Sequence, residues 1–338
     1  MIGMPVANDG MPWAFRQKVS FVFGSGPRGA LVMGHYARGS KQIIPVTECP
    51  VHSARGNRIA FALRERLAKA GITAAGQRGG MLRHLIIRTT LDDREAVAML
   101  VVTHNDKALR SPVRSLLKSA DRPDGFFINI NDRPGPYMVG EQTLKIDGVG
   151  HVRENQIGPA FQISPTAFFQ TNVTAATELV RLVTAAAGPV RRVLDLFSGS
   201  GLFSIPLALA GAQVVAVEEN RQAVKDADVN RRLNRVPEER LRLICARVEE
   251  ALPRLSREPF DAVVLDPPRA GCGEAMLSAL FTRLAPARLV YVSCDPEAFA
   301  RELPIIKSAG YTLTSVQPVD MFPHTDHIEA VAVFDRRA

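Results

Sequence analysis

The second half of the chain alternates short apolar segments with longer amphipathic stretches. The apolar segments are rich in Val, Leu and Ala and have the length of buried strands, while the stretches between them are long enough for helices. This alternation is typical of a doubly wound parallel sheet with helices on both faces. The predicted strands cover residues 193–197, 213–217, 241–244, 262–265 and 289–292.

The end of the chain departs from this alternation. Residues 311–319 and 328–334 form two further apolar segments with no helical stretch between them. An antiparallel hairpin added to the edge of a parallel sheet is typical of class I methyltransferases rather than of dehydrogenases. We therefore predict an α/β fold, a Rossmann-like class I methyltransferase domain with a C-terminal antiparallel hairpin, over residues 159–338.

The first half of the chain is less regular. Residues 55–70 carry apolar side chains at four-residue spacing among several arginines, which predicts a basic amphipathic helix. We predict a smaller α+β domain with a largely antiparallel sheet over residues 1–158, with RNA recognition as its role. Its strands, rich in β-branched and aromatic residues, are predicted at residues 17–24, 30–37, 82–90, 96–103, 125–131, 144–147 and 150–154.

The composition is that of a globular protein long enough for two domains, with 338 residues of which 46% are hydrophobic. No apolar run approaches the roughly 18 residues of a membrane helix, and the first residues lack the pattern of a secretory signal. We expect a cytoplasmic monomer with no membrane partner. The cysteines lack zinc-ligand spacing and predict reduced thiols without a metal; they are Cys49, Cys245, Cys272 and Cys294.

The positive charge of the chain lies in its first half. Residues 1–160 contain 22 Lys and Arg against 13 Asp and Glu, a net charge of +9. Residues 161–338 contain 20 against 21, a net charge of −1. This asymmetry indicates a basic module that binds a polyanion and a neutral module that carries the chemistry. The arginines of residues 55–66 are the expected RNA contacts, and a merely solvated cationic surface is the alternative.

A glycine-rich turn follows the first predicted strand of the second half, in the sequence VLDLFSGSGLF. Gly199 and Gly201 allow a sharp turn and the close approach of a ligand. Glu218 ends the next strand, where its carboxylate can accept hydrogen bonds from two ribose hydroxyls. Ser204 occupies the third glycine position of a dinucleotide motif, and Asp195 precedes the turn. These differences favour S-adenosylmethionine, although other Rossmann-like nucleotide sites have a similar turn.

The sequence Asp266-Pro267-Pro268 follows the fourth predicted strand. It places a carboxylate on a rigid strand end, facing the cleft between a methyl donor and an acceptor base. Methylation at an exocyclic nitrogen usually has an aromatic residue next, to stack the base. Arg269 stands there instead, which argues against that chemistry. A plain Pro-Pro turn is the alternative interpretation.

Cys294 follows the fifth predicted strand, in LVYVSCDP, and Glu329 lies further on, in HTDHIE. Free cysteine is often a core residue, but the carboxyl end of a parallel strand is where α/β enzymes place their chemistry. Methylation at carbon 5 of a pyrimidine needs a thiolate that adds to carbon 6 and a base that removes the proton from carbon 5. Glu329 is a candidate for that base, or else an ordinary strand carboxylate. His324 and His327 are left without a role.

The order of these segments resembles that of the bacterial RNA uracil-5-methyltransferase family, which makes 5-methyluridine in tRNA or ribosomal RNA. The similar segments are SPTAFFQTN, LDLFSGSG, VVAVEEN, VLDPPRAG, YVSCDP and DMFPHTDHIE. The resemblance implies that Cys294 is the nucleophile and Glu329 the proton acceptor. It also implies an S-adenosylmethionine site lined by Gln170, Phe197, Gly199, Leu202, Glu218 and Asp266.

The chain departs from this family in two ways. Family members often begin with a small RNA-binding β-barrel, and no room for one precedes Phe15. Many also hold an iron–sulfur cluster on four cysteines, of which only Cys49 has a counterpart, in TECPVHS. Because one cysteine cannot hold four irons, we predict no cluster. Either this chain has lost the barrel and the cluster or it is an N-terminally shortened form.

We therefore expect an S-adenosylmethionine-dependent RNA (uracil-5-)-methyltransferase that acts through a covalent Cys–uracil adduct, with 23S rRNA favoured over tRNA. The target uridine is expected in a loop or extruded from its stack. One alternative is an RNA cytosine-5-methyltransferase, which usually has a second cysteine where this chain has Pro267-Pro268. Another is a non-catalytic RNA-binding factor that keeps the methyltransferase fold.

Overall fold

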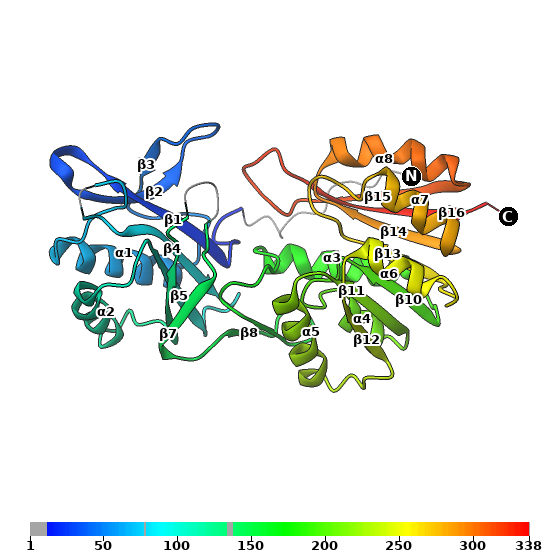
Figure 1. The fold of residues 1–338 in the computed structure, drawn as a ribbon, viewed down its shortest axis with the longest axis horizontal. Helices are drawn as coiled ribbons and strands as arrows, with labels where there is room; N and C mark the ends of the chain where they lie inside the picture. Colours follow the sequence, from blue (N-terminus) through cyan, green and yellow to red (C-terminus); the bar gives the residue numbers. More distant parts are fainter. Residues whose placement is uncertain (1–11, 78, 134–137, 338) are drawn as a thin grey trace. The chain divides into compact units, whose positions relative to one another are not determined.

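The computed structural model describes residues 12–77, 79–133 and 138–337. The chain forms two compact units (Figure 1). The N-terminal unit comprises Trp13–Glu154 and Ile163–Thr166, and the described part of the C-terminal unit comprises residues 12, 155–162 and 167–337. No described helix combines the length and the apolar character that are needed to cross a membrane.

The C-terminal unit is built on a seven-stranded sheet. In spatial order its strands are β12 (Leu241–Cys245), β11 (Gln213–Glu218), β10 (Arg192–Leu196), β13 (Ala262–Leu265), β14 (Arg288–Ser293), β16 (Glu329–Arg336) and β15 (Tyr311–Val319). The first five are parallel, and β16 runs antiparallel to both β14 and β15. The predicted doubly wound sheet with a C-terminal hairpin is confirmed.

Helices cover both faces of this sheet (Figure 1). Because the parallel strands are buried on both faces, they read as nearly continuous apolar runs. Leu194 and Leu196 of β10 point toward the core under α6 to α8, while the alternating residues Val193 and Asp195 point to the other face. One face carries α3 (Val173–Ala187), α4 (Ser204–Leu209) and α5 (Arg221–Leu233), and the other carries α6 (Val248–Leu255), α7 (Glu274–Arg283) and α8 (Pro296–Ser308).

The N-terminal unit is an α+β domain, as predicted. In spatial order its strands are β3 (Ile43–Pro45), β2 (Leu31–Tyr36), β1 (Lys18–Ser25), β4 (Leu82–Thr89), β5 (Ala96–Val102), β6 (Gly125–Ile130) and β7 (Gln142–Gly148). Every neighbouring pair is antiparallel except β5 and β6. Two short helices, η1 (Pro27–Gly29) and η2 (Lys107–Leu109), also belong to this unit, and β8 (Val152–Glu154) and β9 (Phe161–Ile163) form a separate two-stranded sheet.

The helices α1 (Ala54–Lys69) and α2 (Arg110–Leu117) pack against each other and supply one side of the N-terminal core. Helix α1 begins where the side chain of Ser53 accepts a hydrogen bond from the backbone N–H of Gly56, at 3.0 Å. The predicted helix over residues 55–70 is therefore confirmed to within a residue. Helix α2 was not predicted, because its sequence RSPVRSLL is short and contains a proline that ordinarily marks a loop.

Candidate functional site

The carboxyl ends of β10, β11, β13 and β14 meet at one edge of the sheet of the C-terminal unit. The strand order reverses between β10 and β13, since β11 and β12 extend one way and β14 the other. Ligands of open α/β sheets bind in the crevice at this kind of reversal. Four residues that the sequence singles out lie at or just after these strand ends: Phe197, Glu218, Asp266 and Cys294.

The backbone turns sharply after β10. Phe197 has a φ of 64°, in the left-handed region that side chains other than Gly rarely adopt. Gly199 and Gly201 follow with φ values of 54° and 92°. A Cβ atom built on Gly199 would meet no atom within 4 Å. The turn therefore borders open space, and such backbone strain is typical of a ligand site.

The Glu218 carboxylate holds the glycine turn against the end of β11. Its Oε2 atom accepts a hydrogen bond from the backbone N–H of Gly199 at 2.9 Å, and its Oε1 atom accepts one from Asn220 N–H at 2.8 Å. The residue is only partly buried, so each oxygen keeps a lone pair for a further donor. This geometry fits the predicted role of Glu218 as an acceptor for ribose hydroxyls.

Asp195 lies beneath the turn and is fully buried. Its Oδ2 atom accepts a hydrogen bond from the Ser204 hydroxyl, and its Oδ1 atom has no partner among the described residues. Burial raises the pKa of Asp195 to about 7, with a smaller contribution from the negative charge of Glu218. A buried carboxyl group without full hydrogen bonding indicates a site that receives a polar or cationic ligand.

Backbone pairing brings Cys294 and Glu329 together. The antiparallel ladder of β14 and β16 pairs Ser293 with Ala330. Cys294 directly follows the first of these residues and Glu329 directly precedes the second, so the two stand opposite each other one position beyond the last pair of this ladder. The Cα atoms of residues at opposite positions of an antiparallel pair lie about 5 Å apart. The two predicted catalytic side chains therefore leave the sheet at the same place.

The chain breaks after Cys294 because a helix starts at once. The side chain of Asp295 accepts a hydrogen bond from Ala298 N–H at 2.9 Å, and Pro296 takes the first position of α8. An aspartate cap followed by proline is a common start of a helix. The thiol of Cys294 is held between a buried strand and a capped helix, and it stays half-buried.

The charges at this edge influence one another. Burial raises the pKa of Cys294 to about 11, aided by the negative charges of Glu329 and Asp266, while Arg269 acts in the opposite direction. Burial likewise raises the pKa of Glu329 to about 7, against the effect of Arg269. The pKa of Asp266 lies well above its ordinary value, first because of burial and then because of the charge of Glu329. One thiol, two carboxyl groups and one guanidinium thus form a single electrostatic cluster.

Glu329 itself is buried, with 3% of its surface exposed. Its Oε2 atom has no hydrogen-bond partner among the described residues. An ordinary strand carboxylate would be solvated, and the burial of this one costs free energy unless a ligand uses it. The alternative that Glu329 is an exposed strand residue does not fit this structure.

Two other predicted donor-site residues are placed less specifically. Gln170 is buried two residues before Asn172, whose side chain caps α3 by accepting a hydrogen bond from Ala175 N–H at 3.1 Å. Leu202 is buried between the glycine turn and α4. Their roles stay predictions. His324 and His327 lie in the exposed loop between β15 and β16, and the ring of His327 packs edge-on against Phe322.

Sequence reasoning missed a buried hydrogen-bonded group beneath the Asp266-Pro267-Pro268 loop. The carboxylate of Glu302 on α8 accepts a hydrogen bond from the Tyr291 hydroxyl at 2.6 Å and one from Gly273 N–H at 2.7 Å. It thereby ties the loop that carries Arg269 to β14, the strand that ends before Cys294. In the sequence Glu302 reads as an ordinary helix residue, so no local signal could have identified it.

Cys49 belongs to the N-terminal unit and is buried. Its backbone N–H donates to the Asn57 side chain at 2.8 Å, and burial raises the pKa of its thiol. Over the described ranges, no group of three or more His, Cys, Asp or Glu residues is placed to hold a metal ion. Cys49 is therefore a residue of the N-terminal hydrophobic core. The absence of an iron–sulfur cluster stays a prediction.

Comparison with known proteins gives consistent similarities. The sequence model of the tRNA (uracil-5-)-methyltransferase family matches residues 36–337. A Thermosynechococcus vestitus protein named an uncharacterized RNA methyltransferase is 34% identical over 334 residues, which cover 98% of this chain and 73% of that protein. A Gloeobacter violaceus protein with the same description is 34% identical over 339 residues, which cover 98% of this chain and 72% of that protein.

A solved structure is similar over nearly the whole chain. The crystal structure of Pyrococcus abyssi tRNA (uracil-54, C5)-methyltransferase in complex with S-adenosyl-L-homocysteine has a TM-score of 0.81 and 27% sequence identity to this chain. The similarity covers 97% of this chain and 78% of that one. It therefore extends over both units of the fold.

Proposed function

Since the chain belongs to the tRNA (uracil-5-)-methyltransferase family, we propose that it methylates carbon 5 of a uridine in structured RNA through a covalent adduct on Cys294. Family membership makes it an S-adenosylmethionine-dependent RNA methyltransferase. The observation that carries the covalent route is the pairing of Ser293 with Ala330, which sets Cys294 beside Glu329. A thiol and a buried carboxyl group at neighbouring positions are the two groups that this reaction needs.

The proposed reaction on the uracil ring uses Cys294 as the nucleophile and Glu329 as the base. The Cys294 thiol loses its proton and its sulfur bonds to carbon 6, so the carbon 5–carbon 6 π electrons move toward the carbon 4 oxygen. Carbon 5 of this enolate would take the methyl group of a bound S-adenosylmethionine, and the donor would keep the electron pair of the broken sulfur–methyl bond. Glu329 then takes the proton from carbon 5, and that electron pair restores the double bond as the bond between sulfur and carbon 6 breaks. The products are the methylated base, the demethylated donor, the free thiolate and one proton on Glu329, while the proton first lost by the Cys294 thiol is released to solvent.

The thiolate must form against the local charge. Burial and two carboxyl groups raise the pKa of Cys294 to about 11, and the Arg269 guanidinium opposes this rise. A cationic methyl donor held by the same carboxyl groups would reduce their net negative charge and help the thiol to ionise. We therefore infer that the nucleophile becomes reactive when the donor site is filled.

The residues at the strand ends fit S-adenosylmethionine, which supplies an electrophilic methyl group on a positively charged sulfur. The Glu218 carboxylate, which already accepts a hydrogen bond from Gly199 N–H, is the proposed acceptor for ribose hydroxyls, and the open space over Gly199 supports a ligand at the turn. Asp195 and Asp266 are buried carboxyl groups whose raised pKa values a cationic ligand would lower. Gln170, Phe197 and Leu202 complete the proposed donor site.

Replacing Glu218 by Ala is expected to weaken binding of S-adenosylmethionine by about 10²- to 10⁴-fold, because each of two hydrogen bonds to a charged acceptor contributes about 1.5–3 kcal/mol. Isothermal titration calorimetry measures this affinity directly. Glu219→Ala is the matched control, since Glu219 is the exposed neighbour whose carboxylate lies 4.0 Å from Arg247. Equal affinities for the two variants would show that Glu218 does not bind the donor.

Release of tritium tests the proposed reaction. RNA labelled at carbon 5 of uridine is expected to lose one tritium to water for each methyl group incorporated, because methylation replaces the hydrogen at that carbon. Transcripts of 23S rRNA and of tRNA are compared, since we expect the first as substrate and the similar Pyrococcus abyssi enzyme acts on the second. RNA labelled at carbon 5 of cytidine is the control. Methyl incorporation without tritium release from either uridine-labelled RNA would refute the proposal.

The alternatives are less consistent with this site. The matching family acts on uracil, and Pro267-Pro268 stand where an RNA cytosine-5-methyltransferase usually has its second cysteine. A non-catalytic RNA-binding factor would have no need for a buried carboxyl group with an unpartnered oxygen, such as Glu329. Both observations favour an active uracil enzyme.

A further inference from the structure

Helix α2 of the N-terminal unit exposes a row of cations. The exposed side chains of this segment recur every three or four residues, so they share one side of the helix. The opposite side, with Leu109, Val113 and Leu116, is buried in the hydrophobic core. We call the exposed side the α2 face; it consists of Lys107, Arg110, Ser111, Arg114, Ser115 and Lys118.

The α2 face borders an open concavity of about 490 Å³. Among the described residues, none of its four cations takes part in an ion pair. The nearest acidic residue in the sequence is Asp106, whose side chain already accepts a hydrogen bond from Ala108 N–H at 2.7 Å. The concavity therefore combines four unneutralised positive charges with two hydroxyl groups.

This arrangement of charge is unfavourable for the isolated helix. Arg110, Arg114 and Lys118 follow one another at four-residue spacing, about 6 Å apart along the axis, and like charges at that spacing repel. Arg110 is also the first residue of α2, where the helix dipole favours an anion. The first turn contains no acidic residue to compensate. Such repulsion is relieved when a ligand with a row of negative charges lies along the face.

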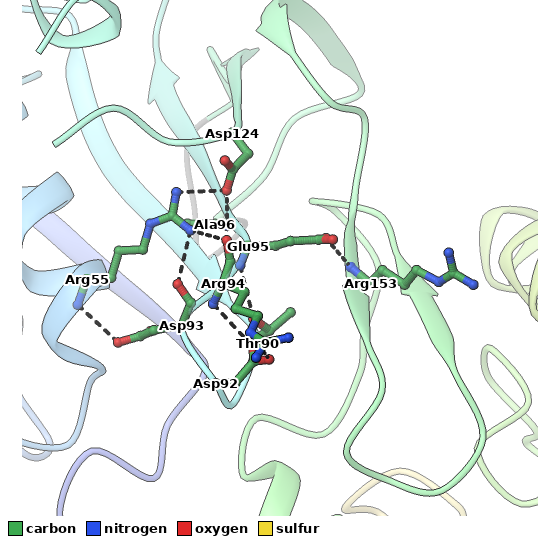
Figure 2. A network of polar contacts seen from close by, with 9 residues as sticks. All are labelled: Arg55, Thr90, Asp92, Asp93, Arg94, Glu95, Ala96, Asp124 and Arg153. Atoms are coloured by element: carbon green, nitrogen blue, oxygen red, sulfur yellow. Dashed lines mark hydrogen bonds and ion pairs between the residues drawn. The ribbon is translucent and has the colours of Figure 1, made fainter. Parts of the chain in front are cut away.

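The arginines of α1, which the sequence indicated first, differ from those of α2. The Arg55 guanidinium donates to the Asp124 carboxylate at 2.8 Å and to the backbone oxygens of Asp93 and Arg94 at 3.1 and 2.6 Å (Figure 2). Arg58 lies 3.8 Å from Asp121. These charges are already used to hold the N-terminal unit together. Among these cations, the charges that no nearby carboxylate offsets are those of α2 rather than those of Arg55 and Arg58. Arg66 of α1 donates to the Ser115 hydroxyl of the α2 face at 3.2 Å and so adds to the charge beside that face.

The chemistry of the α2 face fits phosphate groups. Lys and Arg neutralise phosphates, and serine hydroxyls donate to their oxygens. A membrane-surface helix would expose apolar side chains, but no large hydrophobic side chain within residues 107–118 is exposed. Protein interfaces are depleted in lysine and enriched in aromatic residues, which this face lacks. Without an exposed aromatic ring, the face has nothing on which to stack a base.

We propose that the α2 face binds the phosphate backbone of the substrate RNA without reading its bases. This rests on the proposed function, which supplies RNA as the partner. The N-terminal unit would then hold the RNA through evenly spaced charges, and the choice of uridine would depend on other parts of the protein.

The test is the salt dependence of RNA binding by the full chain. The probe is a fluorescein-labelled, unmodified tRNA transcript, and its affinity is measured by anisotropy between 50 and 300 mM salt. The triple variant Arg110→Gln, Arg114→Gln, Lys118→Gln is expected to reduce the slope of log K against log salt by about 2, or roughly 0.7 per lost phosphate contact. Affinity near 0.15 M salt should fall about 10- to 50-fold.

A matched control removes the same charge from the same unit. The triple variant Arg58→Gln, Lys69→Gln, Arg94→Gln changes exposed cations that already lie within 4 Å of carboxylates, so its salt slope should stay near that of the original protein. A charge-retaining variant, Arg110→Lys with Arg114→Lys, should bind RNA with nearly the affinity of the original protein. Equal losses in the two triple variants would mean that only net charge matters, and would overturn the proposal. The proposal would also be overturned if the α2 triple variant lost binding to anionic phosphatidylserine vesicles but kept its binding to RNA.

Failure of this proposal and failure of the proposed function give different results. If the protein methylates uridine but the α2 variant keeps its salt slope, the surface is wrong and the function stands. If the α2 variant loses RNA affinity but no uridine is methylated, the surface stands and the function is wrong. In the expected case, the α2 variant raises KM for RNA by about the loss in affinity and leaves kcat unchanged.

Discussion

Cys294→Ala is expected to lower the rate of methyl transfer by about 10⁴-fold or more, because removal of a covalent nucleophile leaves only binding and positioning. The variant should bind S-adenosylmethionine and RNA normally, since the thiol is half-buried at a strand end rather than packed in the core. It should also form no RNA–protein complex that survives denaturation. Single-turnover transfer from labelled S-adenosylmethionine to RNA measures the effect.

Cys245→Ala is the matched control for this substitution. Cys245 is an exposed cysteine at the end of β12 in the same unit, outside the electrostatic cluster around Cys294. Its replacement should leave the rate unchanged. If Cys294→Ala turned over at the normal rate, the covalent route would be wrong, even though the chain belongs to the family.

Glu329→Gln is expected to fail at a later step than Cys294→Ala. The thiolate can still add to carbon 6 and carbon 5 can still accept the methyl group, but the proton on carbon 5 then has no acceptor. Protein should accumulate on methylated RNA through a thioether bond, visible as a shifted band on a denaturing gel. Asp335→Asn, near the other end of β16, should give no such band. Free turnover of Glu329→Gln would place the base elsewhere.

Glu329→Gln should also make the free protein more stable at pH 8. Burial raises the pKa of Glu329 to about 7, above its ordinary value of 4.5, so the folded protein binds the proton more tightly than the unfolded chain. Stability from this group is therefore lost as pH rises from about 4.5 to 7. At pH 8 the ionised carboxylate destabilises the fold by on the order of 2–3 kcal/mol. Thermal melting of both proteins at pH 5 and pH 8 should show the difference only at pH 8.

The fold could be predicted where burial on both faces dictates the sequence. The strands of the C-terminal unit are apolar runs because helices cover both of their faces, and the structure places them within two residues of their predicted bounds. The short strand β3 and the helix α2 gave no such signal. β3 is three residues long and lies at the edge of its sheet. Helix α2 buries only one narrow side, and its sequence contains a proline. Their positions depend on tertiary packing.

The site could be predicted only in part for a related reason. Phe197, Glu218, Asp266 and Cys294 each end a recognisable strand, and parallel strands bring their ends to one edge. The proximity of Cys294 and Glu329 depends on the register of β14 and β16, which no local pattern fixes. Glu302 could not be found either, because its partners come from two other elements.

The ladder between β14 and β16 also affects how this enzyme can diverge. The proposed nucleophile and the proposed base stand opposite each other just beyond the last pair of this ladder, so the backbone register sets their spacing. A slip of one residue in β16 would turn Glu329 to the opposite face of the sheet, whereas the connecting residues 320–328 lie outside both strands. Changes of length in that connection leave the register intact. Insertions or deletions in residues 320–328 can therefore change the loop beside the site without moving the proposed reacting pair.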